Sequence, residues 1–423
     1  NRFKGSMTYL DTFARIAAVL IILVAGPTAA HAAEWNFTNT RGVVVGVLKW
    51  QDKGLSPFSD KLRKDKELHS LLLKRGVKAA AMPLLIDSQA TKANIEKAIV
   101  ATAAGADADS VFYFYYAGHG VKGGSEAYVA NYDIQTSNNA ATGLSIRRIA
   151  QLIAENFHGK TVIFTGDFCY SGAFQDALKI IAAKGKQGFV LASSTASNAS
   201  TGNWTFTQTW IECLSGSAFC DRNGDGSITL AETNGEIGEA MKYRERQRNG
   251  FVTAGVDTGL VLSNSLARKA PGTGNYLLAP YQGNLQPARI LGRTGNSIRV
   301  EFFFYSEKKS QVIPDSSAKP FQFRQVKPGA AIRVLWNGKA YDARLLKEED
   351  NFHYITYPGY GAEWNEWVMD DRIISEDTVL AEWKGKWYPA RVLKKDGHKS
   401  FVHYEGFGDE WNEWLPAARI KKP

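Results

Sequence analysis

A histidine and a cysteine that could act together in acyl transfer each follow a short apolar segment. His119 comes shortly after the segment 111–116, and Cys169 comes shortly after the segment 161–165, 50 residues further along. In such a pair the thiolate attacks a carbonyl carbon, while the imidazole removes and returns a proton. Glycines near both residues let a peptide backbone approach and leave N–H groups free to face an oxyanion. The pair predicts a nucleophilic cysteine; a buried core cysteine and a structural histidine are the alternative.

The elements that must position this pair alternate between strand and helix patterns over residues 41–265. Short apolar runs predict strands, and longer periodic segments between them predict helices. The strands are expected at 42–48, 77–86, 111–116, 161–165 and 189–192, and the helices at 59–75, 91–104 and 145–156. This alternation indicates an α/β/α sandwich with a mostly parallel sheet. Because sites form at the carboxyl ends of such strands, His119 and Cys169 are expected at one edge.

The length and composition indicate a folded protein with more than one domain. The chain has 423 residues, 44% of them hydrophobic and 22% charged, which is typical of folded multidomain proteins. The net charge is +9, and the segment 266–330 carries 10 basic against 3 acidic residues, whereas 331–423 is nearly balanced. A nucleic-acid binder concentrates its positive charge on the module that contacts the nucleic acid. The sequence therefore makes no strong case for nucleic acid.

The first 32 residues have the pattern of a secretory signal peptide. Arg15 precedes the apolar run 16–25, and the small-residue site Ala30-His31-Ala32 follows. Ten apolar residues are fewer than the roughly 20 needed to span a bilayer. We expect cleavage near Ala32 and a secreted or periplasmic protein, with an uncleaved membrane anchor as the alternative. No other membrane segment is expected.

An oxidising compartment gives the three cysteines different expected states. Thiols tend to pair there, and three cysteines leave one unpaired. Cys213 and Cys220 flank a short polar loop that a disulfide could close. Cys169 would then remain free, which favours a chemical role for its thiol.

The two motifs resemble those of the caspase-like cysteine peptidases, in particular the bacterial metacaspase branch. The matching pieces are Tyr116-Ala-Gly-His119-Gly120 and Asp167-Phe-Cys169-Tyr-Ser-Gly172, and the histidine of caspases also lies about 50 residues before the cysteine. The resemblance covers about 41–265 and implies a caspase-like domain at 33–265. It implies that His119 and Cys169 form the catalytic dyad. It also implies that the backbone N–H groups of Gly120 and Cys169 form the oxyanion hole.

The same resemblance suggests a preference for basic substrates. Asp167 matches the acidic residue with which metacaspases select Arg or Lys, and Asp65 matches a second pocket acid. A carboxylate at the pocket floor suits a cationic side chain, so the expected partners are proteins or peptides with basic residues. Asp167 could instead simply cap a loop. Two residues depart from the metacaspase pattern. Tyr170 stands where many metacaspases have His, and Ala117 stands where Ser is common, and both affect the expected shape of the pocket.

A twelve-residue segment after the predicted disulfide fits the EF-hand calcium loop. Oxygen donors stand at the required positions, and Gly226 provides the turn. The predicted ligands are Asp221, Asn223, Asp225, Ser227 through its carbonyl, Thr229 and Glu232. The sequence predicts a bound Ca²⁺ that stiffens this segment; an unoccupied acidic turn is the alternative. No cofactor is required for the predicted chemistry.

After a linker at 266–275, the chain contains a repeat of 47 residues. Segment 336–344 matches 383–391, and segment 357–367 matches 404–414; a weaker copy begins at Tyr281. These segments resemble Tudor-like and chromo-barrel (Tudor-knot) domains. The resemblance implies tandem small β-barrels, a degenerate one at 276–328 and two regular ones at 329–375 and 376–423.

The tryptophans of the repeats are expected mainly to pack in the barrel cores, although they could form aromatic cages for a cation. They are Trp336, Trp364, Trp367, Trp383, Trp411 and Trp414. Peptide, cell-wall or intramolecular contacts are the expected role of the barrels.

Two functions remain open at this point. The first is a cysteine endopeptidase that cleaves after Arg or Lys and whose barrels bind substrate or partner. The second is a non-catalytic interaction protein in which the barrels bind a partner and the caspase-like domain is a scaffold. The sequence leaves the oligomeric state open.

Overall fold

The computed structural model describes residues 33–61, 63–303, 308–336, 338–375, 377–405, 407 and 411–423. The predicted signal segment 1–32 lies outside the described residues. Residues 33–423 form one compact unit. In the part of the chain that the structure describes, no helix is long and apolar enough to cross a membrane.

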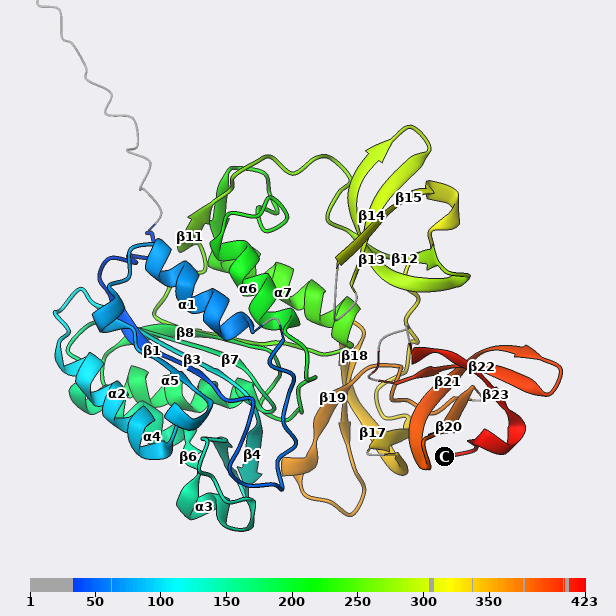
Figure 1. Cartoon of the computed structure of the whole chain (residues 1–423), viewed down its shortest axis with the longest axis horizontal. Coiled ribbons are helices and arrows are strands. Elements are labelled where there is room, and N and C mark those ends of the chain that lie inside the picture. Colours follow the sequence, from blue (N-terminus) through cyan, green and yellow to red (C-terminus); the bar gives the residue numbers. More distant parts are fainter. Residues whose placement is uncertain are drawn as a thin grey trace, which may run out of the picture. The chain divides into compact units, whose positions relative to one another are not determined.

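A six-stranded sheet forms the centre of the first part of the chain, in the order β10-β8-β7-β3-β1-β2 (Figure 1). Five of its strands are mutually parallel: β1 (Thr40–Gly46), β2 (Leu84–Ile86), β3 (Val111–Ala117), β7 (Thr161–Asp167) and β8 (Gln187–Ala192). The edge strand β10 (Gly250–Ala254) runs antiparallel to β8. The mostly parallel sheet expected from the sequence is therefore present.

Helices cover both faces of this sheet. One face carries α1 (Lys64–Lys74), α6 (Thr205–Leu214) and α7 (Leu230–Glu245), and the other carries α2 (Lys92–Ala104), α4 (Ile146–Asn156) and α5 (Phe174–Ala183). Alternate residues of β3 supply the two cores, because successive strand side chains point to opposite faces. Phe112, Phe114 and Tyr116 pack with the second group of helices.

Two predicted elements differ from the structure. The strand expected at 77–86 is reduced to Leu84–Ile86, because Ala79–Ala81 forms a 3₁₀ turn and Pro83 has no N–H to donate to a neighbouring strand. The helix expected at 59–75 begins only at Lys64. The other two predicted helices agree within a residue, and the side chains of Thr91 and Ser145 cap them.

Short elements extend the loops around the sheet. A small sheet in the order β4-β5-β6 directly follows His119; its strands are β4 (Gly120–Gly123), β5 (Glu126–Val129) and β6 (Leu144–Ser145). The helix α3 (Asn139–Thr142) lies between β5 and β6 in the sequence. Strands β9 (Ser227–Thr229) and β11 (Val261–Asn264) pair next to α7.

Three antiparallel sheets make up the rest of the chain, and we call them the first, middle and last repeats. The first repeat contains β12 (Tyr276–Tyr281), β13 (Asn284–Thr294), β14 (Ser297–Phe303) and β15 (Lys308–Pro314). The middle repeat contains β16 (Ala331–Trp336), β17 (Lys339–Glu349), β18 (Phe352–Thr356) and β19 (Glu366–Val368). The last repeat contains β20 (Thr378–Trp383), β21 (Lys386–Asp396), β22 (Lys399–Tyr404), β23 (Glu413–Pro416) and β24 (Ile420–Lys421). Each repeat has its own small hydrophobic core.

The expectation that the repeat tryptophans pack mainly in these cores is wrong for most of them. Trp336, Trp364, Trp411 and Trp414 are between 41% and 50% exposed. Smaller side chains such as Val334, Leu345 and Ile355 fill the core of the middle repeat instead. Only Trp383 packs partly against a repeat core.

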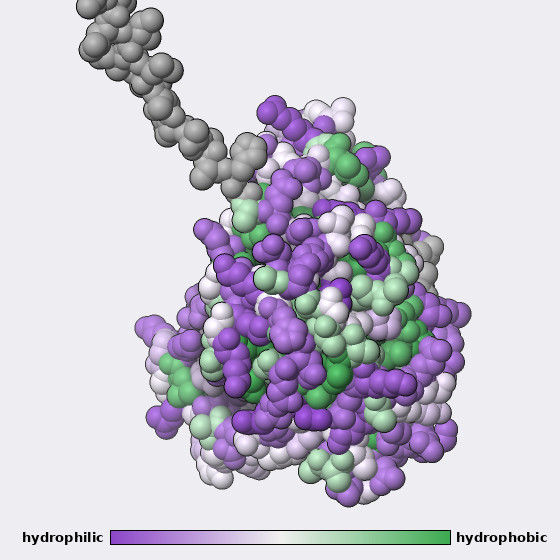
Figure 2. All heavy atoms as spheres, turned by 90° about the vertical axis from the view of Figure 1, so that its left-hand side faces the viewer, coloured by the Kyte–Doolittle hydropathy of each residue, from purple (hydrophilic) through white to green (hydrophobic). Residues whose placement is uncertain are grey.

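Figure 2 shows the hydropathy of one face of the molecule. Most residues there are hydrophilic, and the hydrophobic ones lie in small separate areas.

Candidate active site

Strand pairing places His119 and Cys169 at equivalent positions beyond one edge of the sheet. The parallel register of β3 and β7 pairs Ala117 with Asp167, so each candidate residue stands two positions after a paired residue. The backbones also come into close contact. A Cβ atom at Gly120 would lie 2.0 Å from the carbonyl oxygen of Cys169. Glycine is therefore required at position 120 for this approach.

Backbone amides surround the Cys169 thiol. The N–H of Ser200 donates to its sulfur at 3.3 Å. Burial raises the pKa of the Cys169 thiol, whereas the backbone amides of Ser200, Gly120 and Cys169 itself oppose the rise. These amides can stabilise negative charge that develops beside the sulfur. Two of them, Gly120 and Cys169, are the residues predicted for the oxyanion hole.

His119 is held as a neutral base. Its Nε2 lies 2.8 Å from the carbonyl oxygen of Ser56, which can only accept, so Nε2 carries the proton and Nδ1 keeps a lone pair. The ring packs against both Trp50 and Phe58, with centroid distances of 4.5 and 4.4 Å, and these two rings also contact each other. Burial lowers the pKa of His119, and the bond to Ser56 opposes this effect. An imidazole in this state can accept a proton from a thiol.

Asp167 is buried and bonded to the first turn of α6. Its Oδ2 accepts hydrogen bonds from the Thr207 hydroxyl at 2.7 Å and from the Thr207 N–H at 3.2 Å. That N–H has no partner within the helix, so Asp167 caps the start of α6, whereas the alternative prediction had it cap a loop. Burial raises the pKa of Asp167 to about 7, against the effect of the Thr207 bonds.

Asp65, the second predicted pocket acid, already has a basic partner. The carboxylates of Asp65 and Asp167 both raise the pKa of the buried Tyr115 hydroxyl, although burial is the larger cause. The Arg63 guanidinium bonds the fully buried Asp65 at 2.7 Å and bonds Asp87 at 2.6 Å. Of the two predicted pocket acids, Asp65 is therefore already paired with a basic residue of the chain itself.

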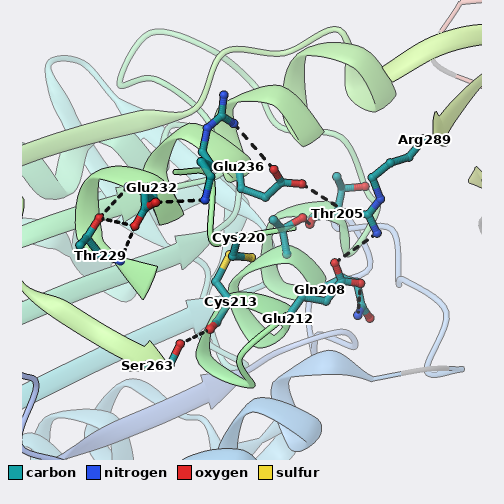
Figure 3. The surroundings of a disulfide bond; sticks show 12 residues. Thr205, Gln208, Glu212, Cys213, Cys220, Thr229, Glu232, Glu236, Ser263 and Arg289 are labelled. Atoms are coloured by element: carbon teal, nitrogen blue, oxygen red, sulfur yellow. Dashed lines mark hydrogen bonds and ion pairs between the residues drawn. A yellow bond between two sulfur atoms is a disulfide. The ribbon is translucent and has the colours of Figure 1, made fainter. Parts of the chain in front are cut away.

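The three cysteines have distinct states. Cys213 and Cys220 form a disulfide, buried against Ile228, and Cys169 is free. The Ser263 hydroxyl donates to the Cys213 carbonyl at 2.6 Å (Figure 3). The disulfide ties the end of α6 to the loop that follows it, and the Ser263 bond joins the same end of α6 to β11.

The predicted calcium loop is closed by its own hydrogen bonds. Glu232 accepts from the Thr229 N–H and hydroxyl with one oxygen (Figure 3), and from the N–H groups of Arg222 and Asn223 with the other. Asp221 accepts from two loop N–H groups, and Asp225 accepts from the N–H of Ser227. Among the described residues, no three or more His, Cys, Asp or Glu side chains form a group that could hold a metal. The calcium site stays a prediction.

Sequence reasoning missed the loop at 195–201. Ser200 contacts the thiol, and the Asn198 carbonyl accepts from the Tyr170 N–H at 2.8 Å. The side-chain amide of Asn198 donates to the carbonyl of Trp367 in the middle repeat at 2.7 Å. The only sequence signal is a run of small polar residues, which does not specify a partner 169 residues away.

Comparison with known proteins gives one family match, which covers the last repeat. The Tudor-knot model, described as the RNA binding activity-knot of a chromodomain, matches residues 373–422. No curated protein matches the chain. Among solved structures, protein GSU0716 from Geobacter sulfurreducens is similar at 16% identity and a TM-score of 0.34, over 52% of this chain and 94% of that chain. The Drosophila initiator caspase Dronc is similar at 9% identity and a TM-score of 0.35, over 60% of this chain and 95% of that chain. TM-scores this low carry no argument about function, so the proposal below depends on the site itself.

Proposed function

We propose that this chain is an exported cysteine endopeptidase that cleaves after Arg or Lys with a His119–Cys169 dyad. The observation that carries the proposal is the convergence at one sheet edge. The register of β3 and β7 gives the two residues equivalent positions. The imidazole of His119 has its Nε2 bonded to a backbone carbonyl, and backbone amides surround the thiol of Cys169. Export follows from the predicted signal segment 1–32.

The chemistry uses groups that are all present in the chain. The thiol proton of Cys169 passes to Nδ1 of His119 as the sulfur attacks the scissile carbonyl carbon. The N–H groups of Gly120 and Cys169 stabilise the oxyanion. The C–N bond then breaks, and His119 returns the proton to the amine that leaves. Water hydrolyses the thioester, which releases the carboxylic acid and restores the thiol.

The test is covalent labelling by an arginyl fluoromethyl ketone, followed by mass analysis of the intact full-length protein. We expect one adduct on Cys169 in the original protein and none in Cys169→Ala. His119→Ala should label at least about 100-fold more slowly, since a general base contributes roughly 10²–10⁴ to such a rate. If Cys169→Ala retains proteolytic activity, the assignment of the nucleophile is wrong.

A second candidate function is binding without catalysis, with the repeats as the working part. The match of residues 373–422 to a Tudor-knot model favours it. The family description mentions RNA, but residues 373–422 carry 9 basic against 8 acidic residues. Such a balance offers little attraction to phosphates, so a protein or peptide ligand is favoured. A folded protein that never labels at Cys169 would support this second function.

A further inference from the structure

We propose that four aromatic side chains of the middle repeat form a distal subsite of the peptidase, which takes a second basic side chain of the peptide substrate. This inference rests on the proposed function. It goes beyond the dyad because it gives one repeat a direct role in substrate choice.

The subsite is part of a cavity of about 700 Å³ that adjoins the candidate active site. One wall comes from segments next to the dyad: Lys122, Tyr170 and residues 197–201. The opposite wall comes from the middle repeat. Neither His119 nor Cys169 lines the cavity itself, but Ser200 does, and its N–H donates to the Cys169 sulfur. A peptide that lies across the thiol can therefore extend into this space.

Hydrogen bonds hold the middle repeat against the loop beside the cysteine. Asn198 bonds both backbone groups of Trp367, donating to its carbonyl at 2.7 Å and accepting from its N–H at 3.2 Å. The Arg248 guanidinium stacks over the Trp367 ring at 4.1 Å. These contacts fix the repeat's wall of the cavity relative to the loop at 195–201.

Four rings on this wall form a box. Trp336 lies edge-on to Tyr341 and to Trp364, at centroid distances of 5.9 and 6.0 Å. Tyr360 lies edge-on to Tyr341 at 6.5 Å and to Trp364 at 6.3 Å. Among the residues that the structure describes, no Lys or Arg of this chain lies over any of the four rings. Ring faces attract a cation by roughly 0.5–2 kcal/mol, more as the cation loses water.

A carboxylate stands beside the aromatic box at this end of the cavity. The exposed carboxylate of Glu363 lines the cavity next to Trp364. Glu366 also lines it, but Arg372 already bonds it at 2.6 and 2.7 Å. Lys122 lies over the Tyr170 ring at 4.5 Å on the opposite wall. Glu363 therefore adds electrostatic attraction for a basic side chain beside the aromatic box. The rest of the lining carries charges of both signs, among them Lys122, Arg246, Arg248, Asp371 and Glu405.

The last repeat supplies a matched control. Its Trp383, Tyr388, Phe407 and Trp411 stand 47 residues after the four box residues, and neighbouring rings are again edge-on. These rings line a separate pocket of about 40 Å³, to which only residues of the last repeat contribute among the described residues. The two boxes share their ring types closely, but only the middle one adjoins the loop at 195–201.

The experiment uses full-length protein and peptides with Arg at the cleavage site. A second Lys is moved residue by residue along the peptide, and kcat/KM is measured for each. We expect one position to raise kcat/KM about 5- to 10-fold, within the range of a cation–π contact. Trp364→Ala should abolish this gain, Glu363→Gln should reduce it, and Trp411→Ala should leave it unchanged. Trp364→Phe, which keeps a ring, should retain part of it and shows that the loss is not misfolding.

Binding to Cys169→Ala, measured by fluorescence anisotropy of labelled peptides, separates the two proposals. Tighter binding of the two-base peptide that depends on Trp364, without cleavage by the original protein, would support the subsite and overturn the proposed function. Cleavage with no preferred position for the second Lys would support the proposed function and overturn the subsite. The subsite would also be overturned if Trp364→Ala and Trp411→Ala reduced the gain in kcat/KM equally.

Discussion

At the scale of single residues, the buried carboxyl of Asp167 makes the proposed preference for Arg testable through pH. Its pKa of about 7 means that the carboxyl is partly protonated at neutral pH because it is buried. A cationic substrate side chain favours the ionised form. Binding of Arg should therefore strengthen as the pH rises and the proton leaves.

We predict that kcat/KM for an Arg substrate rises between pH 6 and 8, beyond any rise that His119 causes. The pKa of His119 is lowered below 6.5 by burial, so protonation of this base takes effect on the acid side of that range. Asp167→Asn should remove the additional rise and reduce kcat/KM about 30-fold or more, the effect of losing roughly 2 kcal/mol from a buried charge pair. A substrate with neutral citrulline in place of Arg is the control. If citrulline shows the same rise, Asp167 is not its cause.

Ionisation of the same carboxyl makes the stability of the folded protein depend on pH in one direction. Its folded-state pKa is raised, so the folded protein binds more protons than the unfolded chain between about pH 4 and pH 7. The contribution is fully present below about pH 4 and is lost as the pH rises through about 7. The unfolding temperature of Asp167→Asn should therefore not show this loss of stability as the pH rises.

At the scale of elements, the sequence predicted the central sheet because its strands and helices have clear periodicities. The ends of β3 and β7 also predicted that His119 and Cys169 lie at one edge of the sheet, since a parallel sheet gathers strand ends there. Prediction failed where a local rule decided the structure. Pro83 shortened a predicted strand, and the small volume of each repeat core left most tryptophans exposed.

The disulfide between α6 and the loop that follows it is an element-scale feature that stability measurements can test. Cross-linking residues 7 apart removes chain entropy from the unfolded state worth about 2.5 kcal/mol. Cys213→Ser with Cys220→Ser should lower the unfolding temperature of the first part of the chain, and reductant should lower that of the original protein similarly. Cys169→Ser is the control, and reductant should affect it like the original protein. An unchanged unfolding temperature on reduction would contradict a stabilising disulfide.

At the scale of the whole molecule, contacts between distant segments decide what each repeat does. The sequence shows three copies of an Ala-Arg pair, at Arg289, Arg344 and Arg391, but it does not show their different surroundings. Arg289 is buried, whereas Arg344 is exposed. Arg391 bonds Glu405 within its own repeat at 3.3 Å. Repeat sequences that are nearly alike therefore gave no basis for predicting which copy docks against α7.

Arg289 attaches the first repeat to the part of the chain that carries the dyad. It pairs with Glu236 of α7 at 3.2 Å and with Glu301 of its own repeat at 3.3 Å, and its guanidinium stacks over Phe219 at 4.2 Å. Burial raises the pKa of Glu236 to about 7, and Arg289 opposes the rise. Removal of the guanidinium would leave this carboxyl buried without its main cationic partner.

We predict that Arg289→Ala destabilises the protein by about 3–5 kcal/mol, as expected when one partner of a buried ion pair is removed. The matched variant Arg344→Ala should change stability by less than about 0.5 kcal/mol, because an exposed side chain loses little on truncation. Urea unfolding of both full-length variants measures the difference. Hydrogen exchange should locate the loss of protection in α7 and in β13 for Arg289→Ala. Equal destabilisation by the two substitutions would mean that the arginine stabilises each repeat internally, and that its contact with α7 contributes nothing to the assembly of the chain.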